Sequence, residues 1–144
     1  MAPLSWLLLV EDEADHRLLI REALTRLSME FQVHEAVDGE SAMAWLQRAS
    51  SDPALLSSGM VVLDLGLPKM SGFNVLEWMR DVPELEQVPV VVLTASENPM
   101  DADHAFNLGV KGYFQKPADF TQYLDIFKRA FHLAEKASGE GGGS

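Results

Sequence analysis

The chain has 144 residues, of which 47% are hydrophobic and 23% charged, and it contains no cysteine. This length predicts one domain around one core, and the lack of cysteine excludes disulfides, iron–sulfur clusters and thiolate chemistry. The formal net charge of -11 argues against a general binder of nucleic-acid phosphates. The sequence has neither a signal peptide nor a stretch of ~20 apolar residues, so we expect a soluble cytoplasmic protein with no membrane contact.

Five short apolar runs alternate with five amphipathic stretches, a pattern typical of repeated βα units. Three of the runs are continuously apolar, as expected of central parallel strands that are covered on both faces. Right-handed crossovers between them predict an α/β fold: a five-stranded parallel sheet in the order 2-1-3-4-5, with a flavodoxin-like three-layer (βα)5 architecture. The runs are Trp6–Val10, Phe31–Ala36, Met60–Leu63, Val88–Leu93 and Gly112–Gln115.

Between the runs, apolar residues recur at the three- and four-residue spacing of a buried helix face. The last stripe continues from Phe120 to Ala134, which predicts that the final helix is the longest. Asn98-Pro99 is typical of a helix start, and Gly109 of the left-handed residue after a helix end. The other stripes begin at Ile20, Ala42, Gly72 and Ala102.

Two segments are predicted to lie outside the repeated units. Residues 48–59 are rich in serine and contain Pro53, which indicates a polar surface connection. From residue 138 the chain reads Ser-Gly-Glu-Gly-Gly-Gly-Ser, a composition typical of a flexible tail. We therefore predict a single domain over residues 1–137 and an unstructured tail over 138–144.

Residues able to do chemistry follow four of the predicted strands. Glu11 and Asp12 follow the first, Asp64 the third, Thr94 ends the fourth, and Lys116 follows the fifth. A single aspartate after a strand is more often a helix cap. Because ligands of open α/β sheets bind outside the carboxyl ends of the strands, this set together predicts a site there.

The carboxylates of this set would raise one another's pKa unless a cation neutralised them. Oxygen ligands favour Mg²⁺, with Mn²⁺ as the alternative, over zinc. A metal, a lysine and a hydroxyl donor together are typical of a phosphoryl-transfer site. The chain has neither a P-loop nor a GxGxxG motif, which leaves Asp64 as the nucleophile that would form an acyl phosphate.

Four motifs carry a family resemblance, and their order and spacing are specific as a set. They are Leu-Val-Glu-Asp-Glu at 9–13, Leu-Asp-Leu-Gly-Leu-Pro-Lys-Met-Ser-Gly at 63–72, Val-Leu-Thr-Ala-Ser at 92–96 and Lys-Pro at 116–117. From residue 5 to about 134, the sequence resembles a CheY-like response regulator receiver domain of two-component signalling.

The resemblance implies that Asp64 accepts a phosphoryl group from the phosphohistidine of a sensor histidine kinase. It implies that Asp12 and Asp64 ligate Mg²⁺, that Glu11 holds the ion through water, and that Gly66 adds its backbone carbonyl. Relatives often carry a side chain two positions after the acceptor that influences the rate of hydrolysis. Gly66 lacks one, so the lifetime of the phosphorylated form is open.

The resemblance also assigns a switch. Thr94 would bond the phosphoryl group, Lys116 would pair with it, and Tyr113 would turn inward on activation, although packing alone also explains a half-buried tyrosine on an edge strand. Family members have a cis bond at the Lys116–Pro117 step. The output surface would lie around residues 102–123.

These implications describe a stand-alone phosphoacceptor switch rather than an enzyme with an external substrate. It would catalyse only its own phosphorylation and autodephosphorylation, and would signal by partner binding or as a homodimer. Its long connection and aromatic final helix resemble the regulators paired with bacterial phytochrome histidine kinases. A fragment of a larger regulator is the other interpretation of the chain.

Two other functions remain open on the sequence. A phosphatase like the haloacid dehalogenases also uses an aspartyl phosphate, but it needs a second aspartate where Gly66 stands. A scaffold with this fold and no phosphotransfer would gain nothing from crowded acids. The histidines lack the spacing of a metal site and are expected to be solvated or locally bonded: His16, His34, His104 and His132.

Overall fold

A computed structural model describes residues 4–143 of the chain. Five parallel strands form one sheet in the order β2-β1-β3-β4-β5, which confirms the predicted topology. The register places Val10 of the first strand level with Leu63 of the third, so the residues that follow these two strands leave the sheet side by side. The strands are β1 (Trp6–Val10), β2 (Gln32–Ala36), β3 (Gly59–Leu63), β4 (Val90–Thr94) and β5 (Gly112–Gln115).

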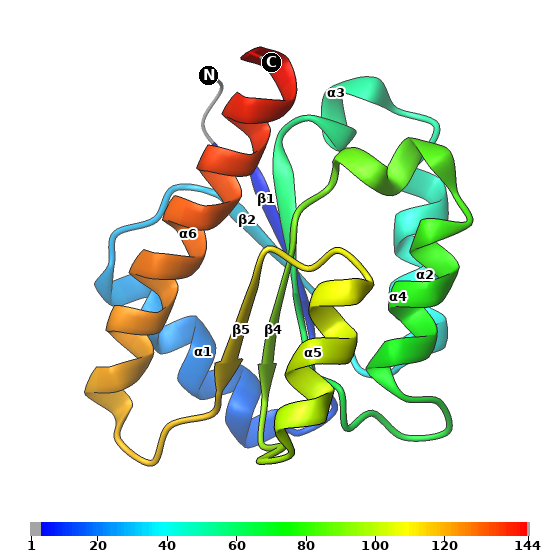
Figure 1. The fold of residues 1–144 in the computed structure, drawn as a ribbon. Helices are drawn as coiled ribbons and strands as arrows, with labels where there is room; N and C mark the ends of the chain where they lie inside the picture. The colour runs from blue at the N-terminus through cyan, green and yellow to red at the C-terminus, as the bar shows by residue number, and fades with distance from the viewer. Residues whose placement is uncertain (1–3, 144) are drawn as a thin grey trace.

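Helices cover both faces of the sheet and complete the three layers. In Figure 1, α1 and α6 lie on one side of the strands and α2, α4 and α5 on the other. The helices are α1 (Ala14–Arg26), α2 (Gly39–Ala49), α3 (Pro53–Leu56), α4 (Gly72–Arg80), the 3-10 helix η1 (Pro83–Gln87), α5 (Pro99–Asn107) and α6 (Phe120–Gly143).

The apolar runs become central strands because both of their faces are covered. Every residue of β1, β3 and β4 is buried. Successive side chains of a strand point to opposite faces: Leu7 and Leu9 pack with α1 and α6, whereas Leu8 and Val10 pack with α2 and α4. The edge strand β2 is partly exposed, as expected where no sixth strand covers it.

Helix boundaries follow the local signals in most places. Asn98 caps α5 by accepting a hydrogen bond from the backbone of Met100, and Gly109 adopts φ 95° after that helix, as predicted. Residues 48–59 contain the short helix α3, which the prediction of a polar connection missed. Asp52 caps it and Pro53 is its first residue, a start signal that the sequence carried. The helix η1 was also not predicted.

The final helix α6 has 24 residues and is the longest, as predicted. It continues over 138–143, where the sequence predicted a tail without structure. Glycine costs a helix about 1 kcal/mol relative to alanine, but an existing helix needs no new nucleus and gains one backbone hydrogen bond per added residue. The domain boundary at residue 137 stays a prediction. None of the helices in the described part combines the length and hydropathy of a membrane span.

Candidate functional site

Three carboxylates meet at the carboxyl ends of β1 and β3. Glu11 and Asp12 directly follow β1, and Asp64 directly follows β3. The backbone N–H of Asp64 donates to the carbonyl oxygen of Val10 at 3.0 Å, which keeps the two strand ends level. Carboxylate oxygens of the three acids lie within 4.8 Å of one another. The structure therefore brings together the acids that the sequence predicted to share a site.

Lys116 reaches into this cluster from the end of β5. Its Nζ lies 2.9 Å from Asp64 Oδ2 and 2.6 Å from Glu11 Oε1, and the lysine side chain is 7% exposed. Its backbone N–H donates to the carbonyl oxygen of Thr94 at 2.7 Å, which ties it to the end of β4. One ammonium thus bridges two buried carboxylates.

The peptide bond between Lys116 and Pro117 is trans, like all peptide bonds in the described residues. The expectation of a cis bond, which came from the family resemblance, is therefore wrong for this structure. Trans is the preferred isomer before proline by about 0.5–1 kcal/mol.

Burial and charge shift two of the site's pKa values. Burial raises the pKa of Glu11 above its ordinary value, and the nearby charge of Asp64 adds to this, while the hydrogen bond from Lys116 acts against it. Burial alone would lower the pKa of Lys116, but its hydrogen bonds to Glu11 and Asp64 outweigh that effect and raise it. Lys116 is therefore a firmly protonated cation at neutral pH.

The loop after β3 holds the other oxygen of Asp64. Gly66 donates its backbone N–H to Asp64 Oδ1 at 3.0 Å, a contact that the sequence did not predict. The predicted metal contact of the Gly66 carbonyl stays a prediction. Gly72 closes the loop: its N–H donates to the Leu65 carbonyl oxygen at 2.9 Å, and a Cβ there would lie 2.5 Å from the carbonyl oxygen of Asp64.

Thr94 ends β4 beside this loop and is 2% exposed. Its Oγ1 accepts a hydrogen bond from the backbone N–H of Ser96 at 3.3 Å. The Ser96 hydroxyl in turn donates to Asp101 Oδ2 at 2.5 Å, which connects the end of β4 to α5. The predicted role of Thr94 as a phosphoryl ligand stays a prediction.

Tyr113 lies on β5, with its ring packed against the core on the α4 and α5 side of the sheet. Its hydroxyl oxygen is buried and makes no hydrogen bond of good geometry among the described residues. Burial raises the pKa of the phenol, and the nearby Ser96 hydroxyl acts against this. A buried hydroxyl without a partner is costly. Its predicted part in a switch stays a prediction.

The acidic cluster fits a hard divalent cation. Glu11, Asp12 and Asp64 offer oxygen ligands alone, the donor type that Mg²⁺ prefers. Among the described residues, the Lys116 ammonium pairs with two of these carboxylates, whereas the Arg17 guanidinium donates to the backbone carbonyl oxygens of Glu11 and Asp12, both at 3.0 Å. The carboxylate of Asp12 thus has no ion pair with a lysine or arginine in the part of the chain that the structure describes. An added cation would relieve this imbalance.

The sequence did not predict the place of His16 in the site. His16 was expected to be solvated or locally bonded, but its Nδ1 lies 2.9 Å from Nζ of Lys116, which is 100 positions away in the chain. The available signal was its position in the helix that directly follows the Glu11-Asp12 pair. Two other histidines make ring contacts: His34 with Trp45 and His104 with Phe73.

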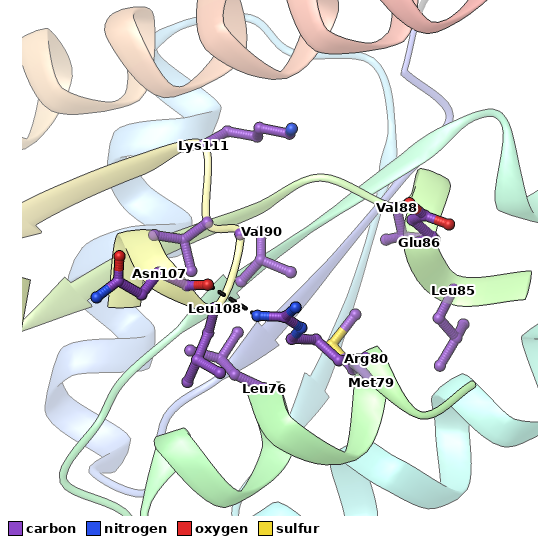
Figure 2. A pocket seen from close by; sticks show the side chains of 12 residues that line it. Leu76, Met79, Arg80, Leu85, Glu86, Val88, Val90, Asn107, Leu108 and Lys111 are labelled. Atoms are coloured by element: carbon purple, nitrogen blue, oxygen red, sulfur yellow. Dashed lines mark hydrogen bonds between the residues drawn. The ribbon is translucent and has the colours of Figure 1, made fainter. Parts of the chain in front are cut away.

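A cavity of about 390 Å³ lies at the other end of the sheet. Figure 2 shows it between α4, η1 and the turn before β5, where Arg80 donates to the backbone carbonyl of Asn107 at 2.8 Å. Its lining combines apolar side chains, such as Leu76 and Val90, with charged ones, such as Arg80. Because it lies at the amino end of β4, it is separate from the acidic cluster.

Comparisons with known proteins agree with this geometry. The model of the response regulator receiver domain family matches residues 7–128. Response regulator Rcp1 of Synechocystis sp. is 34% identical over 122 residues, which are 85% of this chain and 81% of Rcp1.

Two solved structures have a TM-score of 0.75 and cover 88% of this chain. One is the phosphorylated cyanobacterial phytochrome response regulator RcpA, 37% identical, with 91% of its chain covered. The other is the Mn²⁺-bound form of Rcp1, 31% identical, with 94% covered. With its parallel sheet and its acids at the strand ends, this chain belongs to the response regulator receiver domain family.

Proposed function

We propose that this protein accepts a phosphoryl group on Asp64 from a phosphohistidine of a sensor histidine kinase. The phosphorylated form then signals by binding a partner or a second copy of the chain. The bridge that Lys116 forms between Asp64 and Glu11 carries this proposal. It puts a buried cation beside the one carboxylate that follows the central strand, where negative charge develops during transfer.

The reaction is a displacement at phosphorus. A carboxylate oxygen of Asp64 attacks, an O–P bond forms, and the P–N bond of the donor phosphohistidine breaks. The electron pair of that bond returns to the imidazole nitrogen, which takes a proton from water. Lys116 stabilises the transferred negative charge, and the hydroxyl of Thr94 donates to a phosphoryl oxygen.

Asp12 and Asp64 would hold Mg²⁺, or Mn²⁺, with Glu11 acting through water and Gly66 through its carbonyl. The ion would offset the repulsion between the carboxylates and the incoming phosphoryl group. The all-oxygen cluster supports this choice, as does the Mn²⁺-bound form of the related Rcp1.

The kinase is of the phytochrome type, acting in the cytoplasm. The support is the similarity to Rcp1 and to RcpA, which is described as a phytochrome response regulator. A phosphatase like the haloacid dehalogenases is not favoured, because Gly66 offers no general acid two residues after Asp64. A test is phosphotransfer from a purified phytochrome kinase, which we expect to outpace transfer from an unrelated histidine kinase.

The signal passes through Thr94 and Tyr113 to the surface around residues 102–123. The chain of contacts from Thr94 through Ser96 to Asp101 supports this route. Within the part of the chain that the structure describes, the Tyr113 hydroxyl makes no hydrogen bond of good geometry. This supports a second arrangement of the ring, in which such a bond is made.

Incubation with acetyl phosphate and Mg²⁺, followed by intact-protein mass spectrometry, tests the proposal. The wild type should gain the mass of one phosphoryl group, and hydroxylamine should remove it because it cleaves acyl phosphates. Asp64→Asn should gain none. Asp38→Asn is the matched control, an aspartate that also follows a strand, and should still be modified. Modification of Asp64→Asn, or label that resists hydroxylamine, would exclude an aspartyl phosphate at this residue.

A further inference from the structure

Lys116 has a third contact that the proposed function does not use. Besides Asp64 Oδ2 and Glu11 Oε1, its Nζ lies 2.9 Å from Nδ1 of His16. His16 belongs to α1, whereas Lys116 follows β5. This contact therefore connects two elements that are separated by most of the chain.

Donor chemistry sets the direction of this bond. A lysine ammonium has three N–H donors and no acceptor, and three acceptors surround this one. Nδ1 of His16 must therefore accept, so the neutral ring carries its proton on Nε2. The other charged groups that face Nδ1 are farther away, with Glu11 at 3.5 Å and Glu13 at 3.7 Å.

His16 differs from the other two acceptors because phosphoryl transfer does not change it. When the O–P bond of Asp64 forms, the negative charge that the ammonium pairs with there moves outward, from the carboxylate to the phosphoryl oxygens. The ammonium has to pair with this new charge while Glu11, at 2.6 Å, attracts it towards the end of β1. A neutral acceptor on α1 anchors Lys116 equally well before and after transfer.

We propose that His16 is a positioning residue, which holds the ammonium of Lys116 over Asp64 while the phosphoryl group arrives. The inference rests on the proposed phosphorylation of Asp64. It predicts that an acceptor atom at the position of Nδ1 is required, whereas the rest of the ring is not.

Amide variants separate this role from simple packing. The side-chain oxygen of asparagine can take the position of Nδ1, whereas glutamine places its amide near Nε2. With acetyl phosphate and Mg²⁺, we expect His16→Ala and His16→Gln to be phosphorylated about tenfold more slowly than wild type, because a hydrogen bond to a charged group is lost. His16→Asn should recover most of the rate.

Leu18→Ala is the matched control, since Leu18 is 67% exposed on the same helix and should leave the rate unchanged. Far-UV circular dichroism and melting curves confirm that each variant is folded. An unchanged rate in His16→Ala, or an Asn variant as slow as the Ala variant, would overturn the proposal.

Nitrogen NMR of the imidazole tests the bond without any phosphorylation. The ring of His16 should carry its proton on Nε2, and the Nδ1 signal should move towards that of a free imidazole in Lys116→Met. A proton on Nδ1, or an Nδ1 signal that does not move, would show that the bond is absent. If the wild type were not phosphorylated, this would contradict the proposed function of Asp64. The NMR measurement would still show whether the His16–Lys116 hydrogen bond exists.

Discussion

Asp38 and Asp64 both follow strands at the carboxyl end of the sheet, β2 and β3, which are separated by β1, and they have different surroundings. Asp38, after the edge strand β2, accepts hydrogen bonds from the backbone and hydroxyl of Ser41 and caps α2. Asp64, after the central strand β3, is 6% exposed and pairs with Lys116. Ser41, the partner of Asp38, is three positions away in the chain, whereas Lys116, the partner of Asp64, is 52 positions away.

The position of the preceding strand in the sheet separates the structural carboxylate from the functional one. An aspartate that finds its partner in the next helical turn stabilises that turn and stays in solvent. An aspartate that follows a central strand is buried among other strand ends, and burial of its charge is tolerable only with a partner. The role of each aspartate is therefore set by the position of the strand that it follows and not by its residue type.

Removal of the distant partner should have the largest effect on stability. Lys116→Met leaves Glu11 and Asp64 buried without a cation, so we expect the free energy of unfolding to fall by about 3 kcal/mol. Urea denaturation in EDTA measures this, with Ser41→Ala, the partner of Asp38, as the milder comparison. Mg²⁺ should restore more stability to the Lys116 variant than to wild type. Equal losses in both variants would remove the distinction between the two aspartates.

The helices that follow the two aspartates, α2 and α4, begin at Gly39 and Gly72, and these glycines offer a second comparison. A Cβ on Gly72 would meet the backbone oxygen of Asp64 at 2.5 Å, whereas one on Gly39 would meet the flexible side chain of Met70 at 2.6 Å. We expect Gly72→Ala to lower the free energy of unfolding by about 2 kcal/mol and Gly39→Ala by less than about 1 kcal/mol. Chemical denaturation of both variants checks the ranking, and a larger loss for Gly39→Ala would reverse it.

The cap at Asp38 should show a pH dependence of its own. Its hydrogen bonds from Ser41 lower its pKa below 3.8, so the folded state binds this proton less readily than the unfolded state does. The cap's stabilisation is therefore present above pH 3.8 and is lost as pH falls through the folded pKa. In melting curves recorded around and below pH 3.8, Asp38→Asn should retain the helix cap but lose this pH dependence. The same acid dependence in both proteins would assign it to another group.

The smallest effect on stability is expected at Gly66. A Cβ there would meet only Asp64 Oδ1, at 3.8 Å, so Gly66→Asn should change the free energy of unfolding by no more than about 0.5 kcal/mol. An amide two residues after Asp64 can position the attacking water, so the rate of autodephosphorylation should change. Decay of the phosphorylated mass in time measures it, and an unchanged rate would remove this role for position 66.

Local patterns were enough to predict the layers and most of the site. Continuous apolar runs identified β1, β3 and β4, because strands buried on both faces need such runs. The strand ends then identified Glu11, Asp12, Asp64 and Lys116 as neighbours, because parallel strands expose their carboxyl ends at one edge. The short helix α3 was not predicted, because four residues are too few to show the helical period.

Contacts between distant segments could be known only from the folded chain. Three features depend on how side chains pack once the layers are assembled. They are the hydrogen bond from Lys116 to His16, the hydrogen bond from Gly66 to Asp64 and the Tyr113 hydroxyl, which makes no hydrogen bond of good geometry among the described residues. Periodicity assigns a residue to a face of an element, but it carries no information on which partner lies across the gap. That choice is made by the packing of the helices on the sheet.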